Sequence, residues 1–193
     1  MTPEPDPELL ISLAAQRRAL RATLLAARSA LATDTRAGFD ARILDQLGTH
    51  LHATPAACIG AYWPMRAEPD LRAAMHAWHA SGIVVALPLV VAPDQPLRFV
   101  RWTPHAVVEE HRMGARLAGN TEPVQPELLL IPCVGFDERC YRLGYGGGFY
   151  DRTLAAQTTR NWGVAYDCCR IDRLDVQGHD HALDAVFTES RVW

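Results

Sequence analysis

The sequence predicts a single α/β domain with a largely parallel sheet and helices on both of its faces. Apolar segments of strand length alternate with helical segments along most of the 193 residues, as they do in chains built from βαβ units. Hydrophobic residues make up 49% and charged residues 21% of the chain, which is typical of a globular domain that buries a proper core. No internal repeat or linker divides the sequence, so we expect one domain over residues 8–193.

The N-terminal residues favour a short tail followed by a long helix. Residues 1–7, MTPEPDP, are rich in proline and acidic residues and are expected to be disordered, because such a run cannot form a core. Residues 7–31 are rich in leucine, alanine and arginine, which are strong helix formers. The leucines that recur on one face of this predicted helix are Leu13, Leu20, Leu24 and Leu31. That face is the one we expect to be buried.

A second stripe on the same helix is basic. Arg17, Arg21 and Arg28 lie about 60° around the helix from the leucine face at ~3.6 residues per turn. Two interpretations stay open at this point. The stripe is either a solvated basic edge, as most such stripes are, or a set of side chains that point into a cleft and await an anionic ligand.

The next elements follow the same alternation. A second helix is expected over residues 34–50, with a cap at Thr33 or Asp34. Residues 58–64 read as a buried strand, and a helix that ends at Gly82 follows them after a turn. The sequence therefore begins with two helices and continues as a βα unit.

Further strands are expected in the second part of the chain. Residues 83–91 are continuously apolar, as in a strand buried on both faces, whereas residues 97–102 alternate and favour an edge strand or hairpin. Residues 103–126 have no readable pattern. The remaining strands are expected at residues 127–137, 161–168 and 185–188.

The glycine-rich segment at residues 142–154, RLGYGGGFYDRTL, is the strongest functional signal. Its glycines are Gly144, Gly146, Gly147 and Gly148. Glycines permit positive φ and let backbone N–H groups approach an anion, and a helix that begins just after them directs its free N–H groups and dipole at the same point. The segment has no Walker A pattern, and Phe149 breaks the dinucleotide fingerprint. We favour a phosphate-binding loop over the alternative of a flexible turn.

Two strand ends are expected to border one cleft, because ligands of such sheets bind outside the carboxyl ends of the strands. The glycine-rich segment follows one strand end, after Val134, and residues 63–68 follow another. In the latter segment, Trp63 is either a core residue or a platform for a flat ring. Glu68 is either a turn residue or a carboxylate that contacts the ligand.

Two aspartates are candidate magnesium ligands. Asp151 falls in the first turn of the helix that follows the glycines, where an acid also complements the helix dipole. Asp184 precedes the last predicted strand. Because Mg²⁺ usually takes one or two carboxylates together with phosphate oxygens, the two could hold it jointly.

Several classes of function are disfavoured. The net charge of −3 argues against a general nucleic-acid binder, and no apolar run approaches the ~18 residues of a membrane span. The N-terminus has no signal-peptide pattern, so we expect a cytoplasmic protein. The five cysteines have no CxxC spacing and form no zinc motif, and no nucleophile elbow is present.

The segment FDERCYRLGYGGGFYDRTL resembles the signature of the 5-formyltetrahydrofolate cyclo-ligase family, which is similar to FDxxGxRLGYGxGYYDRxL. The resemblance extends over nearly the whole chain, from the arginines of the first helix to the closing D-x-V-x-T-E. The chain departs from the pattern at three places. Cys140 replaces glycine, Phe149 replaces tyrosine, and GNTEP at residues 119–123 replaces GIPEP.

The resemblance implies a three-layer α/β/α domain of the type shared with some sugar-phosphate isomerases and CoA transferases. It also implies ATP-dependent conversion of 5-formyltetrahydrofolate to 5,10-methenyltetrahydrofolate, with release of ADP and phosphate. The formyl oxygen would be phosphorylated, and N10 would then close the ring. ATP would be the co-substrate, Mg²⁺ the cofactor and reduced folate the partner substrate, in a chain that we expect to be a monomer.

The resemblance further implies which residues form the site. ATP would be bound by Arg17, Arg21, Arg142, Leu143, Gly144, Tyr145, Gly146, Gly147, Gly148, Phe149 and Tyr150. The folate would contact Trp63, Glu68, Tyr145, Gly146, Gly147, Gly148 and Phe149. Mg²⁺ would be held by Asp151 and Asp184, and the catalytic residues would be Arg142 and Tyr150.

Two other functions remain open at this point. One is an enzyme of the same fold that acts on a sugar phosphate and needs no ATP. The other is a nucleotide- or folate-binding regulator without turnover. An ATP requirement separates the first from a cyclo-ligase, and phosphate release separates the second.

Overall fold

The computed structural model describes residues 7–111, 114–118 and 122–193. The predicted tail at residues 1–7 lies outside this range except for Pro7, which begins the first helix, a position where proline is favoured. The helices are α1 (Pro7–Ser29), α2 (Thr33–Ala53), α3 (Arg72–Ala80) and α4 (Phe149–Ala156), together with the short 3₁₀ helix η1 (Asp167–Cys169). None of these helices combines the length and hydrophobicity that a bilayer crossing needs, within the part of the chain described here.

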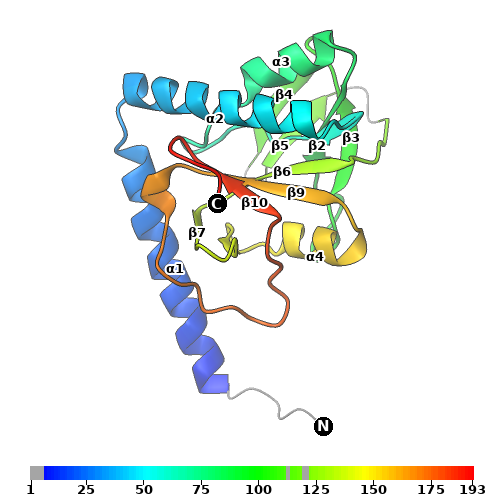
Figure 1. The fold of residues 1–193 in the computed structure, drawn as a ribbon. Coiled ribbons are helices and arrows are strands. Elements are labelled where there is room, and N and C mark those ends of the chain that lie inside the picture. The colour runs from blue at the N-terminus through cyan, green and yellow to red at the C-terminus, as the bar shows by residue number, and fades with distance from the viewer. Residues whose placement is uncertain (1–6, 112–113, 119–121) are drawn as a thin grey trace.

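A six-stranded sheet forms the centre of the molecule, as Figure 1 shows. Its strands, in spatial order, are β10 (Ala185–Phe187), β9 (Arg160–Val164), β6 (Leu128–Pro132), β1 (Cys58–Gly60), β2 (Val84–Leu89) and β3 (Arg98–Trp102). All neighbouring pairs are parallel except β2 and β3, which are antiparallel. The predicted fold class is therefore confirmed, and so is the edge position of β3.

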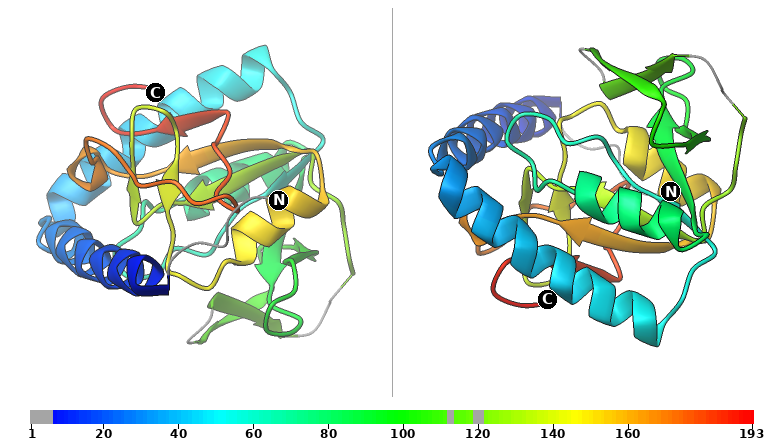
Figure 2. Two further views of the ribbon diagram at one scale, coloured as in Figure 1. Left: turned by 90° about the horizontal axis from the view of Figure 1, so that it is seen from below. Right: turned by 90° about the horizontal axis from the view of Figure 1, so that it is seen from above.

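Both faces of the sheet are covered. Helices α2 and α3 lie over one face and α4 lies over the other (Figures 1 and 2). The apolar strand β6 shows why. Leu128 and Leu130 pack into the core on the α2 side, whereas Leu129 and Ile131 pack into the core that α4 also joins, because successive side chains of a strand point to opposite faces.

Helix α1 lies beyond the carboxyl ends of the strands. Its buried residue Leu24 packs against Val134 and Leu143, which follow β6 in the chain. Gly135 permits this close contact, since a Cβ atom there would lie 2.6 Å from Cδ1 of Leu24 and 3.3 Å from the carbonyl oxygen of Cys169. The predicted leucine face thus places α1 against the end of the sheet where ligands of parallel sheets bind.

The strand predicted at residues 127–137 is wrong in its second half. The chain leaves the sheet after Pro132 and forms a hairpin of β7 (Gly135–Phe136) with β8 (Arg142–Leu143). The buried carboxylate of Asp137 builds the turn by accepting hydrogen bonds from the backbone N–H groups of Arg139 and Tyr141. Such local bonds between side chain and backbone compete with strand pairing.

Two smaller predictions are also corrected, and the stretch without a readable pattern is assigned. The predicted cap of α2 is wrong, because Ala32 occupies the N-cap and no side chain caps the helix. The strand predicted at residues 161–168 ends at Val164 and is followed by η1. The unreadable stretch at residues 103–126 contains a hairpin of β4 (Val107–His111) with β5 (Gly114–Ala118), and its GNTEP departure lies partly outside the described residues.

Cys140 occupies the position where the family pattern has glycine, and its φ of +60° lies in the left-handed region. A residue with a Cβ atom pays roughly 1–2 kcal/mol for this conformation, part of which the greater freedom of unfolded glycine offsets. We therefore expect the free energy of unfolding of Cys140→Gly to be ~1 kcal/mol higher than that of Cys140→Ala. Because both variants lose the same thiol, their difference reports the backbone conformation. Chemical denaturation of both variants measures this, and equal stabilities would contradict it.

Candidate active site

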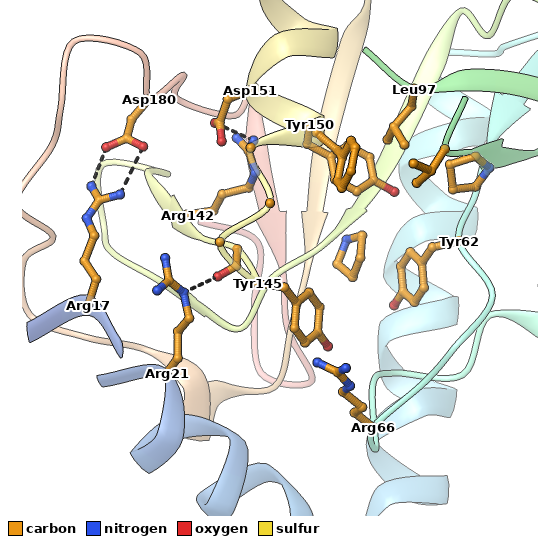
Figure 3. A pocket seen from close by; sticks show the side chains of 18 of the residues that line it. Arg17, Arg21, Tyr62, Arg66, Leu97, Arg142, Tyr145, Tyr150, Asp151 and Asp180 are labelled. Carbon is orange, nitrogen blue, oxygen red and sulfur yellow. Dashed lines mark hydrogen bonds and ion pairs between the residues drawn. The ribbon is translucent and has the colours of Figure 1, made fainter. Parts of the chain in front are cut away.

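A cavity of about 660 Å³ opens at the carboxyl ends of β1, β2 and β6. One end of it carries more arginines than acids, two of them paired with Asp180 and Asp151, and the other end is mainly aromatic and apolar apart from Arg66 and Glu68, as Figure 3 shows for the labelled side chains. The basic end is lined by Arg17, Arg18, Arg21 and Arg142, and the apolar end by Tyr62, Trp63, Pro88, Val90 and Leu97. The glycine-rich segment and residues 63–68 both line it, so the prediction that they border a single cleft is confirmed.

The glycine-rich segment reaches the cavity between β8 and α4. Gly146 has a φ of +93°, and Gly148 has a φ of +66° as the N-cap residue of α4. A Cβ atom on Gly146 would lie 3.3 Å from the guanidinium carbon of Arg21. Glycine is therefore needed at residue 146 for its backbone conformation and for the close approach of an arginine. Leu143, by contrast, is fully buried in the core and does not line the cavity.

Arg17 and Arg21 of α1 line the cavity rather than a solvated edge, whereas Arg28 of the same stripe is buried beside it. Nε of Arg21 donates to the carbonyl oxygen of Gly144 at 2.7 Å. Arg17 forms an ion pair with Asp180 and also donates to the carbonyl of Asp175 at 2.6 Å. Burial lowers the pKa of Arg21, the neighbouring charge of Arg17 lowers it further, and Asp180 opposes this shift. This end of the cavity is suited to an anion.

Arg142 and Asp151 form a second ion pair beside the first. Nη2 of Arg142 donates to Oδ1 of Asp151 at 2.7 Å, and Nη1 donates to the carbonyl of His181 at 3.2 Å. The side chain of Arg142 is only 4% exposed, whereas that of Asp151 is 24% exposed. Arg142 is thus fixed in place, and Asp151 presents part of its carboxylate to the cavity.

Asp184 lies elsewhere, and the predicted pair of magnesium ligands is corrected. Its Oδ2 accepts a hydrogen bond from the backbone N–H of Asn161 at 2.8 Å. Asn161 is near the start of β9, and Asp184 directly precedes β10, which runs parallel to β9. Asp184 is therefore at the amino ends of these strands, whereas Asp151 lines the cavity at the carboxyl ends.

Glu68 is a buried carboxylate at the end of the cavity opposite the ion pairs. Its Oε1 accepts a hydrogen bond from the hydroxyl of Tyr145, and its Oε2 accepts one from the backbone N–H of Met65 at 2.9 Å. Burial raises the pKa of Glu68, while these two bonds act in the opposite direction. The guanidinium carbon of Arg66 lies 5.0 Å from the ring centroid of Tyr145. The hydrogen bond between Tyr145 and Glu68 therefore joins the glycine-rich segment to residues 63–68, which follow different strands in the sequence.

Tyr150 and Trp63 complete the predicted set at the cavity wall. Burial raises the pKa of the Tyr150 hydroxyl, so it keeps its proton at neutral pH. The ring of Trp63 lines the cavity and is also approached by Arg72, whose guanidinium carbon lies 5.7 Å from its centroid. Phe149 likewise lines the cavity, so its missing hydroxyl alters the wall itself.

Several lining residues were not predicted from the sequence. They include Tyr62, Met65, Arg66, Leu97, Gln177 and Asp180. Asp180 comes from the irregular segment between η1 and β10, which has no periodicity that would place it. Arg66 and Ala67 have φ values of +50° and +58°, a strained turn that no glycine or asparagine announces in the sequence.

Comparisons with known proteins identify the family. A sequence model described as the 5-formyltetrahydrofolate cyclo-ligase family matches residues 13–189. The chain belongs to this family. Within it, the chain is 31% identical to a 5-formyltetrahydrofolate cyclo-ligase of Mycoplasma pneumoniae, over 90% of this chain and 98% of that protein. It is 45% identical to one from Escherichia coli K12 over 75 residues, which cover 35% of this chain and only 38% of the relative.

Solved structures of 5,10-methenyltetrahydrofolate synthetases have the same fold as this cyclo-ligase family member. The Aquifex aeolicus protein superposes with a TM-score of 0.78 at 25% identity, covering 91% of each chain. The Mycoplasma pneumoniae protein superposes with a TM-score of 0.75 at 27% identity, over 90% of this chain and 98% of that one. The mixed α/β architecture is thus that of the family.

Proposed function

We propose that this chain is an ATP-dependent ligase that converts 5-formyltetrahydrofolate to 5,10-methenyltetrahydrofolate, with release of ADP and phosphate. The observation that carries the proposal is one cavity with a basic, glycine-lined end and an apolar end that contains a buried carboxylate. The first end suits a polyphosphate and the second a flat ring with N–H donors. Membership of the cyclo-ligase family supports the same pair of ligands.

The reaction needs charge neutralisation and positioning more than a nucleophile from the protein. The formyl oxygen is a poor leaving group and must first be activated. It attacks the γ-phosphorus of ATP, and ADP is released. N10 then attacks the activated formyl carbon and gives up its proton to the surroundings, and the oxygen departs with the phosphate. Fixed cations and oriented reactants lower both barriers.

We assign the ATP end to Arg17, Arg21 and the glycine-rich segment. Arg142 is proposed to neutralise the phosphoryl group in transfer, because Asp151 and the carbonyl of His181 hold its guanidinium in place. Tyr150 is proposed to donate a hydrogen bond to the reacting oxygens, since its raised pKa keeps it protonated. Leu143 contributes only through its backbone, because its side chain is fully buried.

We assign the folate end to Trp63, Glu68, Tyr145 and the facing side of the glycine-rich segment. A pterin carries an amino group and a ring N–H that a carboxylate accepts well. Glu68 suits this task, because it is nine-tenths buried in an environment where hydrogen bonds are strong. Trp63 and Phe149 offer flat apolar surface at the cavity wall.

Asp151 is the residue we propose to hold Mg²⁺. Its partly exposed carboxylate lines the phosphate end, and one carboxylate with phosphate oxygens is a usual ligand set for this ion. When bound, Mg²⁺ would neutralise part of the phosphate charge. We also propose that the protein acts as a monomer.

The formation of methenyltetrahydrofolate, followed by its absorbance, tests the proposal. Purified protein with 5-formyltetrahydrofolate should form it only when ATP and Mg²⁺ are both present, with one phosphate released per turnover. Binding of ATP or folate without phosphate release would instead indicate a regulator. Turnover of a sugar phosphate without ATP would indicate a different enzyme of the same fold.

Arg21→Ala should raise the KM for ATP roughly ten- to hundredfold, because a hydrogen bond to a charged group contributes about 1.5–3 kcal/mol. Steady-state kinetics at saturating folate measure this. Arg42→Ala is the matched control, since Arg42 is an exposed arginine of α2 outside the cavity lining. An unchanged KM for ATP in Arg21→Ala would contradict the assignment of the basic end.

A further inference from the structure

Arg28 is a fully buried arginine at the inner end of α1. Buried charges are costly unless they are paired and hydrogen-bonded, and Arg28 donates from each of its three nitrogens. Nε donates to the carbonyl of Arg66 at 3.1 Å, Nη1 to the carbonyl of Cys133 at 3.2 Å, and Nη2 to the hydroxyl oxygen of Tyr145 at 2.7 Å. One guanidinium therefore joins α1 to three separate segments around the cavity.

The contact with Tyr145 continues to Glu68. A tyrosine hydroxyl has one proton, and because Arg28 donates to its oxygen, that proton is directed to Oε1 of Glu68. The three groups form a line from a positive charge through a hydroxyl to a carboxylate. Each oxygen of Glu68 receives one hydrogen bond from the protein and keeps a lone pair for a ligand.

The opposite charges of Arg28 and Glu68 stabilise each other within the site. Burial alone would lower the pKa of Arg28, but the interactions with Tyr145 and Glu68 raise it. Burial raises the pKa of Glu68, and Tyr145, Met65 and Arg28 oppose that rise. Without Arg28, the carboxylate would lose both its balancing charge and the group that orients Tyr145.

The second contact of Arg28 supports the turn that carries Glu68. Arg66 and Ala67 are both in the left-handed region, a conformation that non-glycine residues keep only where the surrounding structure holds them. The bond from Nε of Arg28 to the carbonyl of Arg66 is such a support. The same side chain thus fixes the backbone of the turn and the carboxylate at its end.

We propose that Arg28 is a positioning residue for the folate end of the cavity, which orients Glu68 through Tyr145 and holds the turn at residues 65–68 without touching a substrate. This rests on the proposed function, since it takes Glu68 to be the group that receives the folate. Arg28 belongs to the same stripe of α1 as Arg17 and Arg21. Those two are assigned to the ATP end, whereas Arg28 acts at the folate end.

Calorimetric binding of 5-formyltetrahydrofolate without ATP tests the proposal. Arg28→Met keeps an unbranched apolar stem and removes the donors, and it should weaken folate binding roughly tenfold to hundredfold while the KM for ATP changes less than about threefold. Arg28→Lys keeps the charge but not the three fixed donors, so its loss should be intermediate. Leu24→Ala is the control for stability, because Leu24 is buried in the same helix but packs against Val134 and Leu143.

A double variant distinguishes a positioning role from a second, independent contact. On a Tyr145→Phe background, which breaks the line to Glu68, Arg28→Met should reduce folate affinity much less than it does alone. The positioning role would be overturned if the losses of folate affinity in the two single variants multiplied in the double variant. It would also be overturned if Arg28→Met lost no more folate affinity than Leu24→Ala. Neither result would affect the cyclo-ligase activity proposed for the wild type. A wild type that binds no folate would overturn the proposed function and this inference with it.

Discussion

Replacement of Asp151 by asparagine is expected to reduce Mg²⁺-dependent turnover by ~10²- to 10³-fold, the loss typical when one group that stabilises transition-state charge is removed. The asparagine oxygen can still accept the bond from Nη2 of Arg142, but the buried guanidinium loses its balancing charge, so some loss of stability is also expected. The asparagine is neutral, so it binds Mg²⁺ more weakly. Titration of activity with Mg²⁺ should therefore need a higher concentration of the ion for half-maximal turnover, and the melting temperature measures the structural cost separately.

Asp184→Asn is the matched control for this experiment. Asp184 matches the second metal ligand by resemblance, but its carboxylate is bonded to the backbone of Asn161 at the amino ends of β9 and β10. We expect its replacement to leave the Mg²⁺ titration unchanged. Equal losses in the two variants would mean that the metal is not held at the cavity end of α4.

Gly146→Ala should cost turnover ~10²- to 10³-fold, far more than it costs folding. The φ of +93° is unfavourable for alanine, and the new Cβ would lie 3.3 Å from the guanidinium carbon of Arg21. The methyl group displaces the arginine and the loop backbone that we assign to the phosphates. The conformational strain itself is worth only about 1–2 kcal/mol of stability. Melting temperature and ATP affinity, measured on one preparation, separate the two effects.

Gly144→Ala supplies the comparison within the same loop. A Cβ atom at residue 144 meets no atom within 4 Å, and this glycine has no positive φ. Its melting temperature should therefore stay close to that of the wild type. If Gly146→Ala unfolds the protein yet its folded fraction binds ATP normally, the glycine-rich segment is a structural turn and not a phosphate loop.

The strands with strong local patterns were predictable from the sequence. The continuous apolar run of β2 reflects a strand that is buried along its middle, and burial is what the hydrophobic pattern records. The edge strand β3 is not buried on one face alone, because Phe99 packs into one core and Val100 and Trp102 pack into the other. The end of β6 was not predictable, because Val134 and Phe136 are as apolar as the strand before them. They are buried by α1 and by the C-terminal segment instead of by the sheet.

The site was predictable where its residues share one local motif. The glycine-rich segment announces itself by composition, and helical spacing places Arg17, Arg21 and Arg28 on one stripe. Spacing alone could not decide what that stripe faces, since this depends on how α1 docks. Asp180 and the strained turn at Arg66 have no local signal, because distant partners fix both of them.

The docking of α1 also sets when the site can exist. Arg17 and Asp180 are separated by 163 positions, so the basic end of the cavity is complete only after nearly the whole chain has been synthesised. Contacts of such separation form late and slowly. We therefore expect the arginines of α1 to reach the cavity only in the last steps of folding, after the local elements have formed.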